Sequence, residues 1–309
     1  MIIDIETHAK AISENGYTII PGQIGVEELA RLNAAADRAV TAVDHAMLSG
    51  LKPAHTTLHS HVRAVRCFYC WDRSCRDLLE HDTVHALGQT VLGDARLWDM
   101  AILEVRPMPS GTELGLFDWH RDFPMSIEDN EHSYLWVFVC LTDTTINNGA
   151  TWVIPGSHRD ASIAQPNHSA ASDMRPPIAI QLTAYAGDIV AFNPLILHAV
   201  GENRTLNCRR LALIGLCRAS HLPLMNHWSI AAYDVQKEAS ERLRRLLYTD
   251  VSLLDETWDV LPNGWPSATK RALLKRSFRR FIRRKRAILS KALQFWWSQL
   301  KSMKKSRKG

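Results

Sequence analysis

Residues 118–124 read DWHRDFP, and this stretch carries His120 and Asp122 two positions apart. On an extended chain, residues i and i+2 point to the same side, so the imidazole and the carboxylate would face one way. A third candidate ligand, His198, closes a separate apolar run over residues 189–197. Side chains at the ends of separate strands can converge only if the strands curl around a common interior. The pattern therefore predicts a barrel.

These residue types also predict a chemistry. Two imidazoles and one carboxylate are the facial ligand set of non-heme Fe(II) oxygenases, which leaves three metal positions open. Arg209 adds a planar cation that suits the far carboxylate of a dicarboxylic acid. We therefore expect an iron site at His120, Asp122 and His198, with 2-oxoglutarate held by Arg209. Taken singly, His198 could instead be a hydrogen-bonded core histidine, and Asp122 could cap a turn.

The rest of the chain alternates short strand patterns with turns. The runs rich in β-branched and aromatic residues cover 96–105, 134–141, 151–154, 178–182, 189–192 and 209–217. Helical patterns occupy residues 24–45 and 76–92, and the chain after residue 220 is again mainly helical in pattern. This arrangement predicts a mainly β fold, an antiparallel jelly-roll or cupin-like barrel with flanking N- and C-terminal helices.

The connecting segments give weaker expectations. Residues 46–66 are expected to form a polar loop with the solvated histidines His55, His59 and His61, and contact of these histidines with substrate or metal is the alternative. A long polar loop over residues 157–177 is a candidate lid. His158 is expected to stabilise its turn rather than bind metal.

The six cysteines do not form a zinc pattern. Cys67, Cys70 and Cys75 have no fourth ligand at a structural-zinc spacing, and the aromatic residues between them suggest a buried strand. Cys140, Cys208 and Cys217 lie in or beside apolar runs and are expected to be small core residues. We therefore expect structural thiols, with redox sensing as the alternative.

Six motifs follow one another between residues 10 and 218. They are NGYTIIPG (15–22), WHRD (119–122), NGATWVIPGSH (148–158), AGDIVAF (186–192), HAVGENR (198–204) and RRLAL (209–213). In this order they resemble the phytanoyl-CoA dioxygenase family of Fe(II)/2-oxoglutarate oxygenases. No motif is decisive alone, but jointly they are specific.

The resemblance implies a double-stranded β-helix and a defined set of site residues. It implies His120, Asp122 and His198 as Fe(II) ligands, Arg209 as the partner of the 2-oxoglutarate C5 carboxylate, and O2 as the oxidant. Related halogenases replace the carboxylate ligand with a small residue, so the presence of Asp122 favours hydroxylation of a C–H bond. Desaturation and ring formation stay open.

Arg210 is the rival for the 2-oxoglutarate role. Arg209 is preferred because its offset from His198 fits the family without a gap. It also shares a strand face with Leu211 and Leu213.

Length and composition fit a globular enzyme. The chain has 309 residues and 46% hydrophobic residues, enough for a substantial core. Its first residues are acidic and their apolar run is short, so we expect a cytoplasmic protein without a secretory leader. The expected divisions are a dioxygenase domain at 1–225, a helical extension at 226–269 and a basic amphipathic tail at 270–309.

The tail is the second strong feature of the sequence. Residues 270–309 contain 16 of the 37 Lys and Arg residues and no Asp or Glu, whereas residues 1–269 carry 21 basic and 32 acidic residues. Aromatic and apolar residues recur in the tail at near-helical spacing. This predicts a helix lying on an anionic membrane, which would place the protein on the inner membrane face. A basic face on a packed helix, nucleic-acid binding and an acidic protein partner are alternatives.

The substrate follows less directly. A membrane-seeking tail suggests a membrane-presented lipid or a lipopolysaccharide precursor such as a Kdo sugar. The alternatives are a soluble specialised metabolite and a nucleic acid gripped by the tail. A non-catalytic cupin-like binding module is the remaining hypothesis. The oligomeric state is not predicted.

Overall fold

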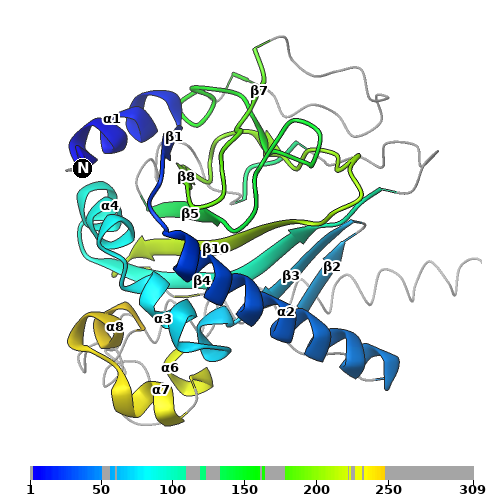
Figure 1. Cartoon of the computed structure of the whole chain (residues 1–309). Coiled ribbons are helices and arrows are strands. Elements are labelled where there is room, and N and C mark those ends of the chain that lie inside the picture. Colours follow the sequence, from blue (N-terminus) through cyan, green and yellow to red (C-terminus); the bar gives the residue numbers. More distant parts are fainter. Residues whose placement is uncertain are drawn as a thin grey trace, which may run out of the picture. The chain divides into compact units, whose positions relative to one another are not determined.

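The computed structural model describes most of the chain up to residue 247 (Figure 1). The described residues are 3–50, 56–59, 61–108, 119–122, 133–160, 162–163, 178–221, 223, 227–231 and 233–247. They belong to one compact unit, Met1–Thr249. A second unit, Asp250–Gly309, lies outside the described residues, and so does the helix expected in the basic tail.

The N-terminal segment forms two helices separated by a strand. Helix α1, Ile5–Asn15, begins at Asp4, whose side chain accepts a first-turn backbone N–H. It ends at Gly16, whose φ of 88° lies in the left-handed region that favours glycine. Strand β1, Tyr17–Ile20, follows, and helix α2 then runs over Val26–Leu48, which includes most of the expected helix.

The prediction of a polar loop over residues 46–66 is wrong. Part of it is a hairpin of β2, Thr56–His59, and β3, Val62–Arg66. Strand β3 also pairs with β4, Ala95–Val105, so its backbone N–H and C=O groups are bonded on both sides. This segment forms strands because β3 pairs with the distant strand β4, and a local sequence pattern gives no sign of such a pairing. His55 lies outside the described residues.

The buried strand expected among the first three cysteines is also wrong. Cys67 adopts a left-handed conformation with φ of 59°, and a 3₁₀ turn, η1, follows at Phe68–Cys70. Helix α3, Arg73–Leu79, comes next, capped by the Asp72 carboxylate. Phe68 and Tyr69 are buried as expected, but in a turn against the helices, and Trp71 is half-buried.

The single helix expected over residues 76–92 is two helices. After α3 the chain breaks, and α4 covers Asp82–Leu92. The ring of His81 accepts the backbone N–H of Thr83 and so begins the new helix. An apolar helical stripe continues across the break, which is why the pattern did not reveal it.

The remaining strands occur where the sequence predicts them, except the two-residue strand His198–Ala199, which no predicted run includes. They are β5, Tyr134–Cys140; β6, Trp152–Val153; β7, Ile180–Gln181; β8, Ile189–Phe192; β9, His198–Ala199; and β10, Arg209–Arg218. A seven-stranded sheet has the order β1-β8-β5-β10-β4-β3-β2, and a three-stranded sheet has the order β7-β6-β9. All the strand pairs are antiparallel. The mainly β, antiparallel fold is therefore confirmed.

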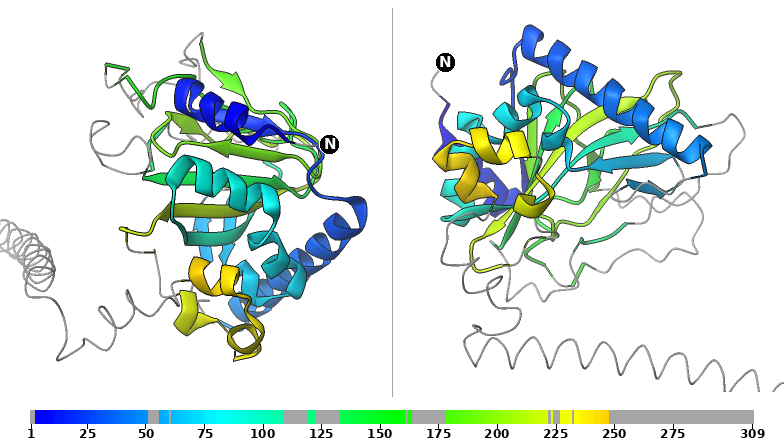
Figure 2. Two further views of the ribbon diagram at one scale, coloured as in Figure 1. Left: turned by 90° about the vertical axis from the view of Figure 1, so that its left-hand side faces the viewer. Right: turned by 90° about the horizontal axis from the view of Figure 1, so that it is seen from below.

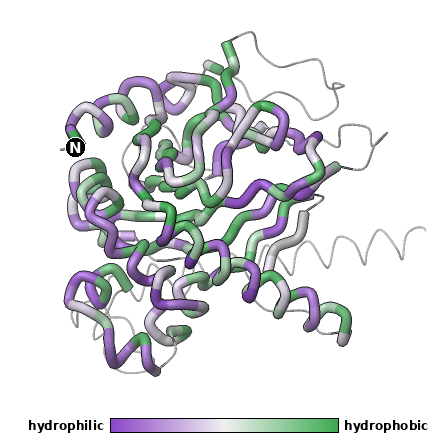
Figure 3. The backbone as a smooth tube through the Cα atoms, in the orientation of Figure 1, coloured by the Kyte–Doolittle hydropathy of each residue, from purple (hydrophilic) through white to green (hydrophobic). Residues whose placement is uncertain are grey.

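Two hydrophobic clusters lie on opposite faces of the larger sheet. One contains Val137, Ile214 and residues of the helices, and Figure 2 shows α2 and α4 on that side of the strands. The other joins Trp136, Phe138 and Leu211 of the large sheet to Val153 of the small sheet. The described strands form two separate sheets and not one closed barrel, and we call the space around this second cluster the barrel interior. Hydrophobic residues concentrate in the central strands, and the helices carry hydrophilic outer faces (Figure 3).

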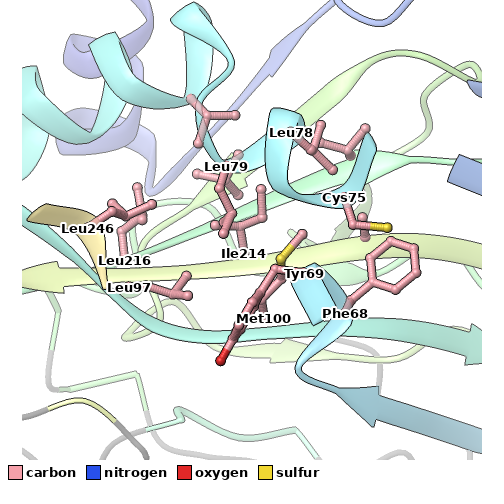
Figure 4. Close-up of a cluster of buried hydrophobic side chains, with 14 of the residues drawn as sticks. Phe68, Tyr69, Cys75, Leu78, Leu79, Leu97, Met100, Ile214, Leu216 and Leu246 are labelled. Atoms are coloured by element: carbon pink, nitrogen blue, oxygen red, sulfur yellow. The ribbon is translucent and has the colours of Figure 1, made fainter. Parts of the chain in front are cut away.

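The helix-facing cluster includes the cysteines near η1 and α3. Figure 4 shows Cys75 beside Phe68, Leu78 and Met100. All six cysteines are free thiols. Burial raises the pKa of the Cys75 thiol to about 12, which makes it an unreactive core residue.

Three short helices complete the described chain. They are α6, His227–Ile230; α7, Tyr233–Glu238; and α8, Glu241–Leu246. Leu243 and Leu246 belong to the same cluster as the strands, so these helices are part of the compact unit. None of the described helices combines the length and the hydrophobicity of a membrane span. The divisions expected at residues 225 and 269 stay predictions.

Candidate metal and 2-oxoglutarate site

Main-chain hydrogen bonds bring the three expected metal ligands together. His120 and His198 form an antiparallel bridge, with N–O distances of 3.0 and 3.1 Å in the two directions. The Asp122 N–H donates to the Pro194 carbonyl over 3.1 Å. The segment carrying His120 and Asp122 thus lies alongside the one that leads into His198, in agreement with the predicted convergence of these residues.

The side chains converge as well. One ligand atom from each of His120, Asp122 and His198 lies within 4.8 Å of the other two. Asp122 Oδ1 is 3.4 Å from His120 Nε2, and Oδ2 is 3.5 Å from His198 Nε2. Two ligand atoms at right angles, each about 2.1 Å from a metal ion, lie about 3 Å apart. Small movements would bring this group to that spacing.

Hydrogen bonding prepares His198 for metal binding. Its ring is buried, and its Nδ1 lies 2.9 Å from the Ile196 carbonyl oxygen. A carbonyl oxygen only accepts, so Nδ1 carries the proton and Nε2 presents a lone pair toward Asp122. Burial lowers the pKa of His198, which favours the neutral ring that a metal requires.

Asp122 is ionised despite its surroundings. Burial by itself would raise the pKa of its carboxyl group, but His198, His120 and the Trp136 N–H outweigh burial and hold that pKa below its ordinary value. The indole Nε1–H of Trp136 donates to Asp122 Oδ2. Sequence reasoning missed this contact, and a tryptophan within a strand gave no indication of it.

Arg209 supplies a buried cation with free donors. It lies on β10, is 1% exposed, and its Nε and Nη2 atoms have no hydrogen-bond partner among the described residues. Burial lowers its pKa to about 10, which still leaves the guanidinium charged at neutral pH. A buried charge without a partner is costly, so these N–H groups are suited to an anionic ligand.

Arg210 has a different environment. It points to the helix-facing side of β10, where its Nε donates to Glu104 over 2.8 Å and its Nη1 donates to Asp37 over 2.5 Å. Arg63 donates to the same Glu104 carboxylate. Arg210 therefore belongs to an ion-pair network between the sheet and α2, whereas Arg209 faces the barrel interior.

Comparison with known proteins bears on this arrangement. The family model for phytanoyl-CoA dioxygenase (PhyH) matches residues 12–211. The chain belongs to the phytanoyl-CoA dioxygenase family. This confirms the resemblance carried by the six motifs, and the match includes strands β1 to β9, the first residues of β10 and all four expected site residues.

The curated relatives are dioxygenases. The chain is 30% identical over 165 residues to dioxygenase cdmD of Talaromyces verruculosus, which is 50% of each chain. It is 26% identical to the iron/alpha-ketoglutarate-dependent dioxygenase ausU of Aspergillus calidoustus, over 69% of this chain and 71% of that one. For the first curated relatives, the matched segment covers only about half of the relative's own length. Iron and 2-oxoglutarate, expected from the sequence, are thus the cofactor and cosubstrate named for a member of the family.

Solved structures support the fold. The non-heme alpha ketoglutarate dependent epimerase SnoN from nogalamycin biosynthesis aligns with a TM-score of 0.51 and 21% identity, over 70% of this chain and 83% of that one. At this identity the likeness concerns the fold alone.

The residues of this chain fit both Fe(II) and 2-oxoglutarate. The neutral His198 ring and the ionised Asp122 carboxylate are donors that Fe(II) accepts, and His120 Nε2 lies beside them. The unpaired N–H groups of Arg209 fit a carboxylate.

Two neighbouring residues hold the site's backbone rather than a ligand. Arg121 donates through Nε to the Leu195 carbonyl and through Nη2 to the Ser157 carbonyl, both over 2.9 Å. The ring of His158 contacts the Ser13 carbonyl oxygen at 2.9 Å and is fully buried, outside the three-residue cluster.

Proposed function

We propose that the chain is an Fe(II)/2-oxoglutarate-dependent dioxygenase that hydroxylates a C–H bond. In this proposal His120, Asp122 and His198 hold the iron, and Arg209 binds the C5 carboxylate of 2-oxoglutarate. The observation that carries the proposal is the buried Arg209 guanidinium with free N–H groups, on the sheet face that also carries the barrel interior. A hydrogen-bonded core histidine and a turn-capping aspartate would not need this cation.

The chain's own residues would bind, orient and exclude water. The two N–H groups of Arg209 would fix one end of 2-oxoglutarate, so that its oxo-acid end reaches the metal. Phe192 packs 5.2 Å from the His198 ring and 4.9 Å from Phe138, measured between centroids, and keeps this side of the site apolar. Bound iron would supply the position where O2 reacts with 2-oxoglutarate, releasing succinate and CO2 and transferring one oxygen atom to the substrate.

The aromatic side chains near Asp122 support an apolar, ring-containing substrate. Trp98 lies edge-on to Trp136 with ring centroids 5.3 Å apart, and Tyr134 lies 5.9 Å from Trp98. Both Trp98 and Tyr134 are half-buried. Aromatic walls favour flat, apolar ligands. We therefore propose a small specialised metabolite as the substrate, in line with a neighbour named for nogalamycin biosynthesis.

The lipid-linked or Kdo substrate expected from the tail is the alternative. It rested on the tail alone, and neither the site nor the relatives support it. Incubation of the iron-loaded protein with 2-oxoglutarate, O2 and polycyclic metabolites, or with lipid-linked sugars, tests the two. We expect substrate-dependent succinate formation with the first set.

Variants connect that reaction to the site. Asp122→Ala is expected to abolish succinate formation, whereas Asp77→Ala, which removes an exposed carboxylate on α3, should leave it unchanged. Unchanged turnover in Asp122→Ala would remove Asp122 from the ligand set. A well-folded wild type that forms no succinate with any substrate would favour a binding module.

For the basic tail we propose an anionic membrane surface as the partner. What supports this is the absence of acidic residues from 270–309 together with the aromatic pair Trp296 and Trp297 among the basic residues. Nucleic acid and an acidic protein are the competing partners. Co-sedimentation with anionic vesicles separates the first from the others.

A further inference from the structure

The Asp122 carboxylate has a neighbour that the family's ligand set does not include. Trp136, on β5, is 7% exposed and donates its indole N–H to Asp122 Oδ2. Tryptophan has a single polar hydrogen, and here it is used on a candidate metal ligand. The other carboxylate oxygen, Oδ1, is the one that lies 3.4 Å from His120 Nε2. Oδ2 also lies 3.5 Å from His198 Nε2, so each oxygen faces one ligand imidazole, and the indole donates to Oδ2 alone.

The indole is held in place by packing on several sides. Trp98 meets it edge-on, with centroids 5.3 Å apart and planes at 71°, and the Phe138 ring lies 6.2 Å from it. Directly across the ladder, Gly215 of β10 is the residue paired with Trp136. The ring thus lies over a glycine.

Gly215 is required by the ring and not by the backbone. It is absent from the residues with positive φ, so its conformation is open to other amino acids. A Cβ at this position would lie 2.5 Å from Trp136 Cζ3 and 3.1 Å from Cε3 and Cη2. Contacts this short force the indole to move. A glycine inside a strand is otherwise unfavourable, which agrees with a role in close packing.

A bulge places Trp98 beside the same ring. Gly215 pairs with Asp99 and Leu216 pairs with Leu97, so Trp98 is the additional residue on β4. Its carbonyl oxygen lies 3.0 Å from His227 Nε2, which anchors the bulge to α6. The tryptophan that borders Trp136 is therefore itself held by the fold.

We propose that Trp136, seated on Gly215, is a positioning residue that holds Asp122 to metal coordination through a single oxygen. The inference rests on the proposed iron site. A carboxylate can bind a metal through one oxygen or two. Donation from the indole fixes the plane of the carboxylate and weakens Oδ2 as a donor, which leaves Oδ1 for the metal. One-oxygen binding keeps three positions open for 2-oxoglutarate and O2.

Anaerobic Fe(II) titration of the full chain tests this with Trp136→Phe. Phenylalanine keeps an aromatic ring on β5 at this position and removes the N–H. We expect Fe(II) affinity to fall about 10- to 100-fold, the range for lost partners of metal ligands. Trp71→Phe makes the same chemical change in a half-buried tryptophan packed on the helix-facing cluster, and its Fe(II) affinity should equal that of the wild type.

The visible spectrum of bound Co(II) reports on the metal ligands and would not change through a general loosening of the fold. In the Co(II)-loaded full chain, a change from one-oxygen to two-oxygen binding alters the visible ligand-field spectrum. We expect Trp136→Phe to change that spectrum, with circular dichroism unchanged, and Trp71→Phe to leave it as in the wild type. Wild-type affinity and spectrum in Trp136→Phe would overturn the inference.

Gly215→Ala tests the second half of the proposal. It should weaken Fe(II) binding in the wild-type background and have a smaller effect when Trp136 is already phenylalanine, because the atoms nearest the new Cβ are then gone. Equal effects in the two backgrounds would show that Gly215 does not act through the indole. A wild-type chain that binds no Fe(II) would instead overturn the proposed function, and this inference with it.

Discussion

At the scale of single residues, the neighbours Arg209 and Arg210 point to opposite faces of one strand, so one is expected to bind a ligand and the other to stabilise the fold. Arg209 faces the barrel interior with unpaired donors, and Arg210 faces α2 within ion pairs to Glu104 and Asp37. Two identical side chains, one position apart, therefore have opposite expected roles.

Paired substitutions test those roles. Arg209→Met should weaken 2-oxoglutarate binding at least about 30-fold, because it removes the charge partner of a buried carboxylate. It should not lower the free energy of unfolding of the ligand-free protein, because the lost guanidinium was unpaired. Arg210→Met should keep 2-oxoglutarate affinity and lower the free energy of unfolding by about 1–3 kcal/mol. Calorimetric titration and urea unfolding measure both, and the reverse assignment would contradict the site.

His227 gives a pH-dependent prediction. Burial lowers its pKa from the ordinary 6.5 to about 4, with Tyr69 Oη 3.1 Å from Nδ1 and the Trp98 carbonyl 3.0 Å from Nε2. Between these pH values the unfolded chain binds the extra proton and the folded chain does not. Its contribution to stability is therefore complete above pH 6.5 and is lost as the pH falls toward 4.

The size of that loss is about 3 kcal/mol. His227→Gln cannot take up the proton, so the difference in unfolding free energy between wild type and variant should shrink by about this amount from pH 7 to pH 4. Urea unfolding at fixed pH values measures it. A constant difference across that range would contradict a buried neutral His227.

The sequence is sufficient to propose four candidate site residues, but not the residues that hydrogen-bond to them. His120, Asp122, His198 and Arg209 have spacings and residue types that indicate their chemistry. Trp136 donates to Asp122 across 14 positions, through the pairing of separate strands, and no local pattern contains that contact. Sequence spacing indicates candidate ligands, whereas the hydrogen-bond partners of those ligands can be identified only from the folded structure.

At the scale of elements, β10 carries Arg209 and lies between two neighbouring strands of the larger sheet. It pairs with β4 on one side and β5 on the other. Strong β patterns such as residues 134–141 were predicted correctly because burial on both faces selects β-branched and aromatic residues. The hairpin of β2 and β3 was missed because a local pattern does not show that Arg63 of β3 can be buried in an ion-pair network.

That network should be essential for stability. Arg63, with its side chain 7% exposed, donates to Glu104 over 3.0 Å, and Arg210 donates to the other Glu104 oxygen. Glu104→Gln removes the buried counter-charge that Arg63 and Arg210 share and leaves them only the more exposed carboxylates of Asp44 and Asp37, so the free energy of unfolding should fall by about 3–5 kcal/mol. Asp77→Asn, at an exposed pair, should change it little. An equal effect of the two variants in urea unfolding would contradict this view.

At the scale of the whole molecule, charge is divided unevenly. Residues 1–269 are net acidic and residues 270–309 are purely basic, so the net charge of +5 conceals two opposite parts. A basic segment attracts anionic lipid by about 1 kcal/mol per Lys or Arg near the surface. An acidic catalytic part would be repelled from the same surface, which makes the tail the expected contact.

Vesicle binding tests that contact. The full chain should sediment with vesicles containing phosphatidylserine and not with neutral vesicles, and binding should weaken as salt increases. Replacing the five residues Arg279, Arg280, Arg283, Arg284 and Arg286 with glutamine should release the protein and leave Fe(II) affinity unchanged. Retained vesicle binding by that variant, or tighter binding to DNA than to vesicles, would contradict a membrane role.

The central claim is that one site holds both Fe(II) and 2-oxoglutarate. Its most direct test is anaerobic titration of the full chain with Fe(II) and 2-oxoglutarate, following the weak visible charge-transfer band that appears when both bind together. The wild type should show the band, His198→Ala should lose it with the metal, and Arg209→Met should need far more 2-oxoglutarate to reach it. A folded, iron-loaded wild type that shows no band would contradict the account.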